Sequence, residues 1–342
     1  MQKISRPGSK TLFVIRGKLG DTLAAWPSVA LYAKRHPEEK IVLAVRRNYA
    51  FLLSRETAVR LLPFASSGEL FLRVLWERLN GGIARLAVLW GFGKPVARLA
   101  RLSGAPLRAY LDTRFGSTFN MIADESPNER ISDAAWRVAR LFDQDLPRPD
   151  QLGIPSLVAA RRRHTQSAIC LAPVADEARR CMDRPTLEQL IAGARQRFPD
   201  APLWLLGNPD DQALAPLLAT PLPEGVSLKP FPQLAQLVDA LEQCRHLLTT
   251  DTGVYHLAAS LGVPCTLFFG PTQPEKNTLP AQSEVAKLRL APLGNRHCEI
   301  KTCHQPVCLH RIVSEWSDSS SNKRVPVELP SGCLLQASSL ND

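Results

Sequence analysis

The sequence predicts an α/β protein built from two similar domains. Segments with the pattern of buried strands alternate with segments that have the pattern of helices, and this alternation is typical of parallel sheets covered by helices. A chain of 342 residues also exceeds the usual size of a single hydrophobic core. The alternation stops in a stretch rich in Pro and Gly and then starts again, which predicts a domain boundary in the middle of the chain.

The first domain is predicted over residues 1–150. Its strand-like segments are TLFVIR (11–16), KIVLAV (40–45), RLAVLW (85–90) and LRAYLD (107–112). Helices are expected over residues 21–35, 70–79 and 129–142. In the last of these, ERISDAAWRVARLF, apolar residues recur at the spacing of one helix face, so we expect a packed helix that closes the domain.

Residues 151–166 are predicted to form a linker, because Pro and Gly interrupt any period there. The second domain is predicted over residues 167–315. Its strands are expected at SAICLAP (167–173), PLWLLG (202–207), HLLTT (246–250) and PCTLFFG (264–270), and its helices over 186–198, 210–218, 232–243 and 254–261. Residues 316–342 are rich in Ser and Pro, and we expect them to form a tail that carries no chemistry.

The composition favours a globular protein with an anionic partner. Hydrophobic residues make up 45% of the chain and charged residues 22%, which excludes a wholly disordered protein. The net charge of +10 favours anionic lipid, phosphorylated sugar or nucleic acid as partner. We expect no nucleic acid, since basic patches with interleaved aromatics and zinc-finger spacings are not found. The polar N-terminus and the charges within every long apolar run favour a cytoplasmic protein.

The segment TTDTGVYHLAASLGVPCTLFFGPTQP (249–274) gathers polar residues where a strand leads into a helix. An Asp or Thr there can cap the helix, a Gly lets a ligand approach the backbone, and the free N–H groups of the first turn attract anions. A His within the first turn and a second polar turn after the next strand face the same sheet edge. The residues expected at this anion site are Asp251, Thr252, Gly253, His256, Gly270 and Thr272. The alternative is an ordinary capped helix with a packed histidine.

A comparable turn lies near the N-terminus, in VIRGKLGDTLAAWPSVALYAKRHP (14–37). A strand passes through a loop with Gly17 and Gly20 into a helix that Asp21 opens. Asp21 can be a helix cap, the usual role of Asp at this position. It can also be a general base that accepts a proton from a substrate hydroxyl. Both interpretations stay open at this point.

These two segments resemble the heptosyltransferases of lipopolysaccharide core assembly, glycosyltransferase family 9. Softer matches are LSGAPLRAYL, ERISDAAWRVARLF and CEIKTCHQPVCLHRI, so that the resemblance covers most of the chain. It implies the GT-B architecture, in which two Rossmann-like α/β/α domains face each other across a cleft. The first domain then binds the acceptor and the second binds the nucleotide-sugar.

The resemblance also implies a function. The protein is expected to be an inverting, metal-independent glycosyltransferase without a cofactor, which transfers a heptose from ADP-heptose to a lipopolysaccharide core acceptor at the inner face of the cytoplasmic membrane. Asp21 is then the general base, with Lys18 and Gly20 on the acceptor side. Residues 251–256 then bind the donor, and helix N–H groups with a nearby imidazole stabilise the charge that develops on the leaving nucleoside diphosphate.

One motif departs from the family pattern. Family members usually carry Lys-x-Trp-Pro after the first strand of the second domain, with the Lys on a phosphate, whereas this chain has Met182 and Arg184 at the Lys and Trp positions before Pro185. Arg179, Arg180 or Arg184 can replace the Lys, because guanidinium groups also pair with phosphate. The departure leaves three alternatives open: another nucleotide-sugar donor, a protein acceptor, or a non-catalytic relative that binds nucleotides or polyanions.

An acidic residue that contacts the ribose in the family is matched by Asp211 in LLGNPDDQAL. A helix cap at Asp210 or Asp211 explains the same residues equally well.

Four C-terminal cysteines have wider spacing than a zinc knuckle: Cys298, Cys303, Cys308 and Cys333. Some relatives that glycosylate autotransporter proteins hold iron through C-terminal cysteines. Packed, reduced thiols are the interpretation favoured here, because no close Cys pair is present.

Overall fold

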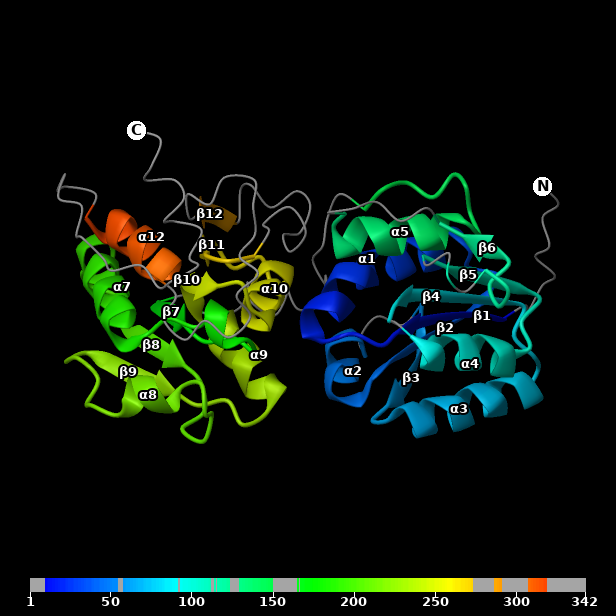
Figure 1. Cartoon of the computed structure of the whole chain (residues 1–342), viewed down its shortest axis with the longest axis horizontal. Coiled ribbons are helices and arrows are strands. Elements are labelled where there is room, and N and C mark those ends of the chain that lie inside the picture. Colours follow the sequence, from blue (N-terminus) through cyan, green and yellow to red (C-terminus); the bar gives the residue numbers. More distant parts are fainter. Residues whose placement is uncertain are drawn as a thin grey trace. The chain divides into compact units, whose positions relative to one another are not determined.

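The computed structural model describes residues 10–54, 58–91, 93–111, 114, 116–123, 129–149, 165, 167–272, 286–290 and 307–318. The chain divides near residue 156 into two compact units (Figure 1). Each unit has one six-stranded sheet in which all pairings are parallel. The predicted fold class, two parallel-sheet α/β domains, is therefore confirmed.

The first unit has the sheet order β3-β2-β1-β4-β5-β6. Its elements are β1 (Lys10–Ile15), α1 (Leu19–Arg35), β2 (Lys40–Arg46), α2 (Arg47–Leu53), β3 (Arg60–Phe64), α3 (Ser67–Leu79), β4 (Arg85–Trp90), α4 (Lys94–Ser103), β5 (Leu107–Tyr110), β6 (Met121–Ile122) and α5 (Ile131–Arg140). Helices α1 and α5 lie on one face of the sheet, and α3 and α4 lie on the other (Figure 1). All six residues of β1 are buried, as expected for a central parallel strand with helices on both faces.

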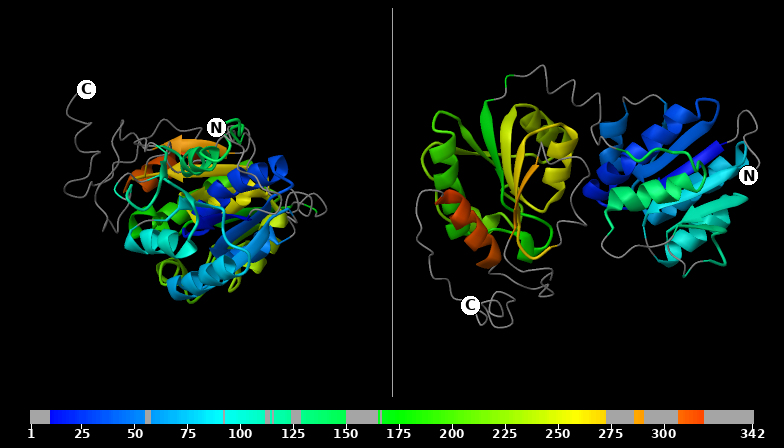
Figure 2. Two further views of the ribbon diagram at one scale, coloured as in Figure 1. Left: turned by 90° about the vertical axis from the view of Figure 1, so that its right-hand side faces the viewer. Right: turned by 90° about the horizontal axis from the view of Figure 1, so that it is seen from above.

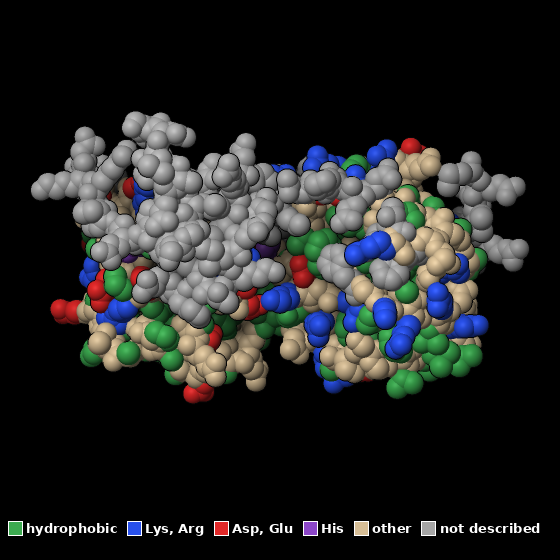
Figure 3. Space-filling model, in the orientation of Figure 1, with side chains coloured by type: hydrophobic (Ala, Val, Ile, Leu, Met, Phe, Trp, Pro, Cys, Tyr) green, Lys and Arg blue, Asp and Glu red, His purple; other side chains and the backbone are tan. Residues whose placement is uncertain are grey.

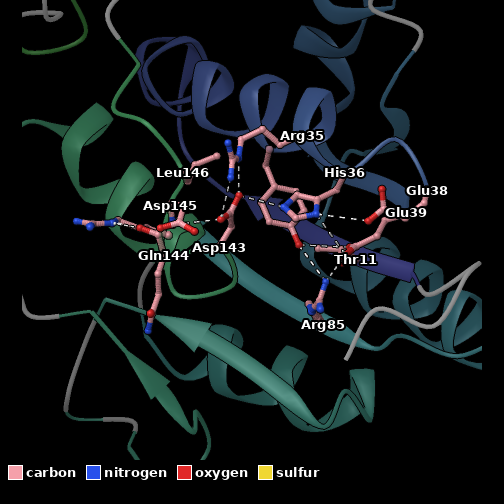
Figure 4. Close-up of polar contacts among 12 residues, drawn as sticks. Thr11, Arg35, His36, Glu38, Glu39, Arg85, Asp143, Gln144, Asp145 and Leu146 are labelled. Carbon is pink, nitrogen blue, oxygen red and sulfur yellow. Dashed lines mark hydrogen bonds and ion pairs between the residues drawn. The ribbon is translucent and has the colours of Figure 1, made fainter. Parts of the chain in front are cut away.

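A network of polar side chains fixes the amino ends of these strands (Figure 4). The buried Glu39 carboxylate accepts a hydrogen bond from the Thr11 hydroxyl (2.7 Å) and pairs with Arg85. At the end of α1, His36 Nε2 lies 3.1 Å from the Asp143 carboxylate. These contacts join the starts of β1 and β4 to the end of α1, at the edge of the sheet opposite the carboxyl ends of the strands.

The second unit has the sheet order β9-β8-β7-β10-β11-β12. Its elements are β7 (Ala168–Ala172), the 3₁₀ helix η2 (Ala178–Arg180), α7 (Arg184–Arg197), β8 (Leu203–Leu206), α8 (Ala215–Leu218), β9 (Val226–Lys229), α9 (Leu234–Glu242), β10 (Cys244–Thr250), α10 (Gly253–Ser260), β11 (Cys265–Phe269), β12 (Ala286–Leu290) and α12 (Val307–Ser317). Figure 2 shows α7 and α12 on one face of this sheet and α9 and α10 on the other. Counted within its own unit, each sheet has the strand order 3-2-1-4-5-6.

The C-terminal boundary differs from the expected one. Helix α12 continues to Ser317, and Trp316 packs in the apolar core with its ring 5.5 Å from that of Phe268. Trp316 and Ser317, which were expected to belong to the tail, are therefore part of this helix. The helix could have been predicted from the helical spacing of its apolar residues Leu309, Ile312, Val313 and Trp316. The Ser-rich residues that follow obscured this pattern.

Several shorter elements were also missed, namely α2, β3, α4, β6, β9 and β12. The helix expected over 210–218 is reduced to α8, because the residues before it form turns. Within the part of the chain that the structure describes, no helix combines the length and apolar content needed to cross a membrane.

Candidate functional site

In both sheets the strand order reverses between the first and fourth strands of the unit. Loops that leave the carboxyl ends of these two strands diverge to opposite faces of the sheet, and the gap they leave is where open α/β sheets bind ligands. In the second unit the two strands are β7 and β10, which pair in parallel. The loops after them carry Arg180 and Asp251, two of the residues that the sequence predicts for the donor.

Arg180 reaches the end of β10 from the loop after β7. This loop closes on itself, because the Cys181 thiol donates to the Ala175 carbonyl (3.1 Å) while its sulfur accepts from the Ala175 N–H (3.2 Å). The closed loop presents Arg180 to the neighbouring strand end. There, Arg180 Nη1 donates to the Asp251 carbonyl oxygen (2.9 Å) and lies 3.5 Å from the Asp251 carboxylate.

The buried Asp251 carboxylate also joins two adjacent strand ends. The hydroxyl of Thr272, in the turn after β11, donates to Asp251 Oδ2 (2.8 Å). Strands β10 and β11 are parallel neighbours, so this bond holds the two polar turns at one edge of the sheet. The structure therefore brings together Asp251, Thr272 and Arg180, which are all among the residues that the sequence predicts for the donor.

Helix α10 starts at this edge with Gly253. Thr252 is its N-cap in an extended conformation, and the Thr252 side chain makes no capping hydrogen bond. His256 follows within the first turn and is buried. Burial lowers its pKa to about 4, because desolvation outweighs the attraction of the nearby Asp251 carboxylate. The imidazole is therefore neutral at physiological pH.

Three buried polar atoms of this site have no hydrogen-bond partner among the described residues. They are His256 Nδ1, Arg180 Nε and Thr250 Oγ1. An unpaired buried polar group is costly, and more than 90% of such groups in native proteins are paired with protein or ordered water. Because these atoms gather at the mouth of α10, where helix N–H groups favour anions, they indicate a site for a polar, anionic ligand.

Arg184, which was also predicted to bind the donor, contacts a different part of the second unit. Arg184 donates to the carbonyl oxygens of Leu217 (2.6 Å) and Pro221 (2.8 Å), which fastens the end of α8 to the start of α7. Met182, at the position of the family's Lys, is buried in the apolar core. Arg180, one of the three arginines considered for the phosphate contact, reaches the end of β10 with its guanidinium.

Asp211 and Gly270 have structural contacts within the second unit. The exposed Asp211 carboxylate accepts a hydrogen bond from the Ala213 N–H (2.9 Å) and so stabilises the turn before α8. Gly270 packs against α12, because a Cβ at this position would lie 3.0 Å from both Cys308 Sγ and Leu309 Cγ. Cys308 is buried within that helix. Cys298, Cys303 and Cys333 lie outside the described residues.

The first unit has its own reversal point, between β1 and β4. Here Arg16 follows β1, and its N–H donates to the Trp90 carbonyl at the end of β4 (2.8 Å). The Arg16 guanidinium donates to the Ser67 hydroxyl at the start of α3 (2.8 Å). Burial is the main cause that lowers the pKa of Arg16, and the positive charge of Arg46 lowers it further. Arg16 was not predicted from the sequence, although a residue directly after a buried strand is expected at the carboxyl edge of a parallel sheet.

Asp21 lies five residues after Arg16, in the first turn of α1. Its Oδ2 accepts a hydrogen bond from the Lys18 N–H (2.6 Å), and Gly20 precedes it in the same turn. Burial raises the pKa of Asp21, and the Lys18 bond opposes the rise. A Cβ at Gly17 would lie 2.3 Å from the Asp21 side chain, so glycine is needed for this close approach. Contrary to the expectation from the sequence, Asp21 does not open the helix, because α1 begins at Leu19 with Lys18 as N-cap. Asp21 is the third residue, where its carboxylate forms the capping box with Lys18, and its raised pKa suits a base.

Two parallel-sheet units with polar sites at their reversal points match the GT-B-like architecture of solved structures. The glycosyltransferase family 9 protein of Veillonella parvula DSM 2008 matches with a TM-score of 0.68 and 15% identity, over 82% of this chain and 86% of that chain. E. coli heptosyltransferase WaaC with ADP matches with a TM-score of 0.66 and 15% identity, over 86% and 96%. E. coli ADP-heptose lipopolysaccharide heptosyltransferase II matches with a TM-score of 0.62 and 21% identity, over 90% and 98%.

The sequence also matches a family model. The model of glycosyltransferase family 9 (heptosyltransferase) covers residues 148–308. No curated protein matches the chain. The family match confirms the resemblance seen in the sequence, and it assigns this part of the chain to glycosyltransferase family 9. The protein is therefore an enzyme of the glycosyltransferase class.

Proposed function

We propose that the protein transfers a heptose from ADP-heptose to a lipopolysaccharide core acceptor, with inversion at the anomeric carbon and with Asp21 as general base. The observation that carries this proposal is the set of unpaired buried polar atoms of Arg180, Thr250 and His256 at the mouth of α10. A solved relative in this fold class is E. coli WaaC with ADP-2-deoxy-2-fluoro heptose, which supports an ADP-sugar as the ligand.

The donor diphosphate binds at the reversal point of the second unit. The N–H groups of the first turn of α10 and the guanidinium of Arg180 meet its negative charge. The imidazole of His256 donates one hydrogen bond to the diphosphate. Because this imidazole is neutral, no further charge is buried. Arg180 takes the place that a Lys has in the family, since Met182 is in the core. Thr252 and Thr272 supply hydroxyls at the same edge.

The acceptor binds at the reversal point of the first unit. Asp21 removes the proton from the acceptor hydroxyl while that oxygen attacks the anomeric carbon from the face opposite the nucleotide. The bond between sugar and diphosphate breaks, and its electron pair leaves with ADP, whose charge Arg180 and the helix N–H groups stabilise. Arg16 and Lys18 make this site electropositive, which suits a phosphorylated or carboxylated acceptor. The step requires neither a cofactor nor a metal, and it takes place at the inner face of the cytoplasmic membrane.

Nucleotide-sugars distinguish this proposal from its alternatives. In thermal denaturation of the full chain, ADP-heptose should raise the melting temperature more than UDP-, GDP- or CMP-sugars at equal concentration, because a ligand at 100 times its Kd adds about 2.7 kcal/mol to the free energy of unfolding. Transfer to lipopolysaccharide core fragments, with α/β configuration read by NMR, then tests the reaction. A preference for another nucleotide, or transfer only to a protein, would replace the proposal with that alternative. Binding without any transfer would indicate a non-catalytic relative.

A further inference from the structure

Helix α3 carries a stripe of exposed apolar side chains. Leu72, Trp76 and Leu79 are 70%, 56% and 75% exposed. Their spacing of four and three residues places them on one face of the helix. The packing face of α3 is a different one and includes Leu70 and Val74, which are fully buried. Single exposed apolar residues are ordinary, but a contiguous stripe that includes a Trp marks an interaction surface.

Helix α4 packs against α3 and carries a cationic stripe of the same spacing. Lys94, Arg98 and Arg101 are exposed. Arg78 joins the two helices, because its Nη1 donates to the Leu102 carbonyl (3.2 Å). In Figure 3, hydrophobic side chains gather over α3 at the lower right of the molecule, with Lys and Arg side chains beside them. The two helices thus present apolar and basic side chains next to each other.

The acidic residues of these helices do not cancel this charge. Glu69 pairs with Arg47 and Arg73. Glu77 is buried and pairs with Lys10 and Arg60. Helix α4 has no acidic residue. The surface is therefore apolar and positively charged.

We propose that the exposed face of α3 and α4 docks on an anionic lipid bilayer. Leu and Trp side chains enter the boundary between headgroups and acyl chains, where Trp is favoured, and Lys and Arg side chains stay at the lipid phosphates. Juxtaposed basic residues strengthen the attachment to anionic lipid. An acidic protein would suit the α4 stripe but not the apolar stripe of α3, so the lipid surface satisfies both.

The position of this surface fits a lipid-linked acceptor, and this one step depends on the function proposed above. Helix α3 starts at Ser67, which accepts the hydrogen bond from Arg16 at the reversal point. Helix α4 follows β4, the other strand of that point. Docking through these helices would hold the edge with Asp21 close to the bilayer in which such an acceptor is anchored.

Co-sedimentation of the full chain with vesicles tests the proposal without donor or acceptor. The wild type should bind vesicles of phosphatidylcholine with about 30% phosphatidylglycerol and should not bind phosphatidylcholine alone. Leu72→Ser/Leu79→Ser and Arg98→Glu/Arg101→Glu should each weaken binding at least about tenfold. The matched control Lys34→Glu/Lys40→Glu changes the net charge equally at exposed positions outside α3 and α4, and it should weaken binding less than about threefold.

Trp76 provides a direct readout. Tryptophan emission should shift to shorter wavelength on vesicle binding, and Trp76→Phe should remove most of this shift although five other tryptophans remain out of six. Circular dichroism and the ADP-heptose thermal shift show whether each variant is folded and still binds donor, which separates a failure of docking from a failure of the proposed function. Absence of wild-type binding, or equal binding by all variants, overturns the proposal. So does a wild-type dimer in sedimentation that Leu72→Ser/Leu79→Ser dissociates, since a second copy would then cover the stripe.

Discussion

Replacing Arg180 by Met tests the donor site most directly. In the free protein this change removes the guanidinium that bonds to the Asp251 carbonyl at 2.9 Å. In the complex it removes a charge-assisted contact to the diphosphate. Hydrogen bonds to charged groups contribute roughly 1.5–3 kcal/mol, so ADP should bind about 10- to 150-fold more weakly. Arg180→Lys keeps the charge but loses the planar guanidinium. Its affinity for ADP should therefore lie between those of the wild type and Arg180→Met.

The same substitution should lower stability only modestly. The Arg180 and Asp251 side chains are 16% and 5% exposed, so their attraction is only partly screened by solvent. Asp251 nevertheless keeps the hydrogen bond from Thr272. A loss of roughly 1–3 kcal/mol in the free energy of unfolding is expected for a buried acceptor that loses one partner. Isothermal titration with ADP, alongside urea denaturation, measures both quantities.

Arg184→Met is the matched control, with the same chemical change four residues away. It removes the bonds to the Leu217 and Pro221 carbonyls, so it should lower stability by a similar amount while leaving the Kd for ADP within about threefold. Wild-type affinity in Arg180→Met would refute the reasoning. Loss of affinity in Arg184→Met alone would assign the phosphate contact to Arg184 instead.

Three further expectations rest on single residues. Asp21→Asn should lower kcat by about 10²–10⁴ and leave the Kd for ADP unchanged, as measured by transfer assays and titration; normal turnover would remove Asp21 from the role of base. His256 should make stability depend on pH. Because its pKa is about 4 in the folded protein and the ordinary value is 6.5, the unfolded chain binds the proton first, and about 3 kcal/mol should be lost as the pH falls from 7 to 4. Urea denaturation across this range should show a smaller slope for His256→Gln, and an equal slope would contradict the assignment. Met182→Lys restores the family residue but places a charge in the core, so it should cost roughly 3 kcal/mol or more in stability, against less than about 1.5 for Met182→Leu. Normal stability of Met182→Lys would show that this position can reach solvent.

Local patterns were sufficient for most of the second unit and for the helix mouth. Strand β10 and helix α10 are visible in the sequence, because a buried strand followed by a capped, Gly-containing helix start has a distinct local signature. The proximity of Thr272 to Asp251 was also predictable, since neighbouring parallel strands end at the same sheet edge. Helix α4 was missed because it is short and because Gly93, Pro95 and Gly104 at its ends have the pattern of a loop.

The role of each arginine in the segment 179–184 was not predictable. Three guanidinium groups within six residues have the same chemistry, and a local pattern does not tell which of them turns toward a strand 70 residues away. The fold of the loop after β7, closed by Cys181 on Ala175, directs Arg180 to Asp251, while the start of α7 directs Arg184 to the end of α8. The buried position of Met182 follows from the same loop.

The amino-acid sequence by itself determined the two α/β halves, the family resemblance and the polar turns at Asp21 and Asp251, because these depend on interactions within one strand–turn–helix unit. Only the tertiary structure decided which side chains share a site, which polar atoms are left unpaired in it, and that α3 presents an apolar stripe beside the basic stripe of α4. Burial and proximity are properties of contacts between distant segments, and the order of the strands in the sheet sets those contacts.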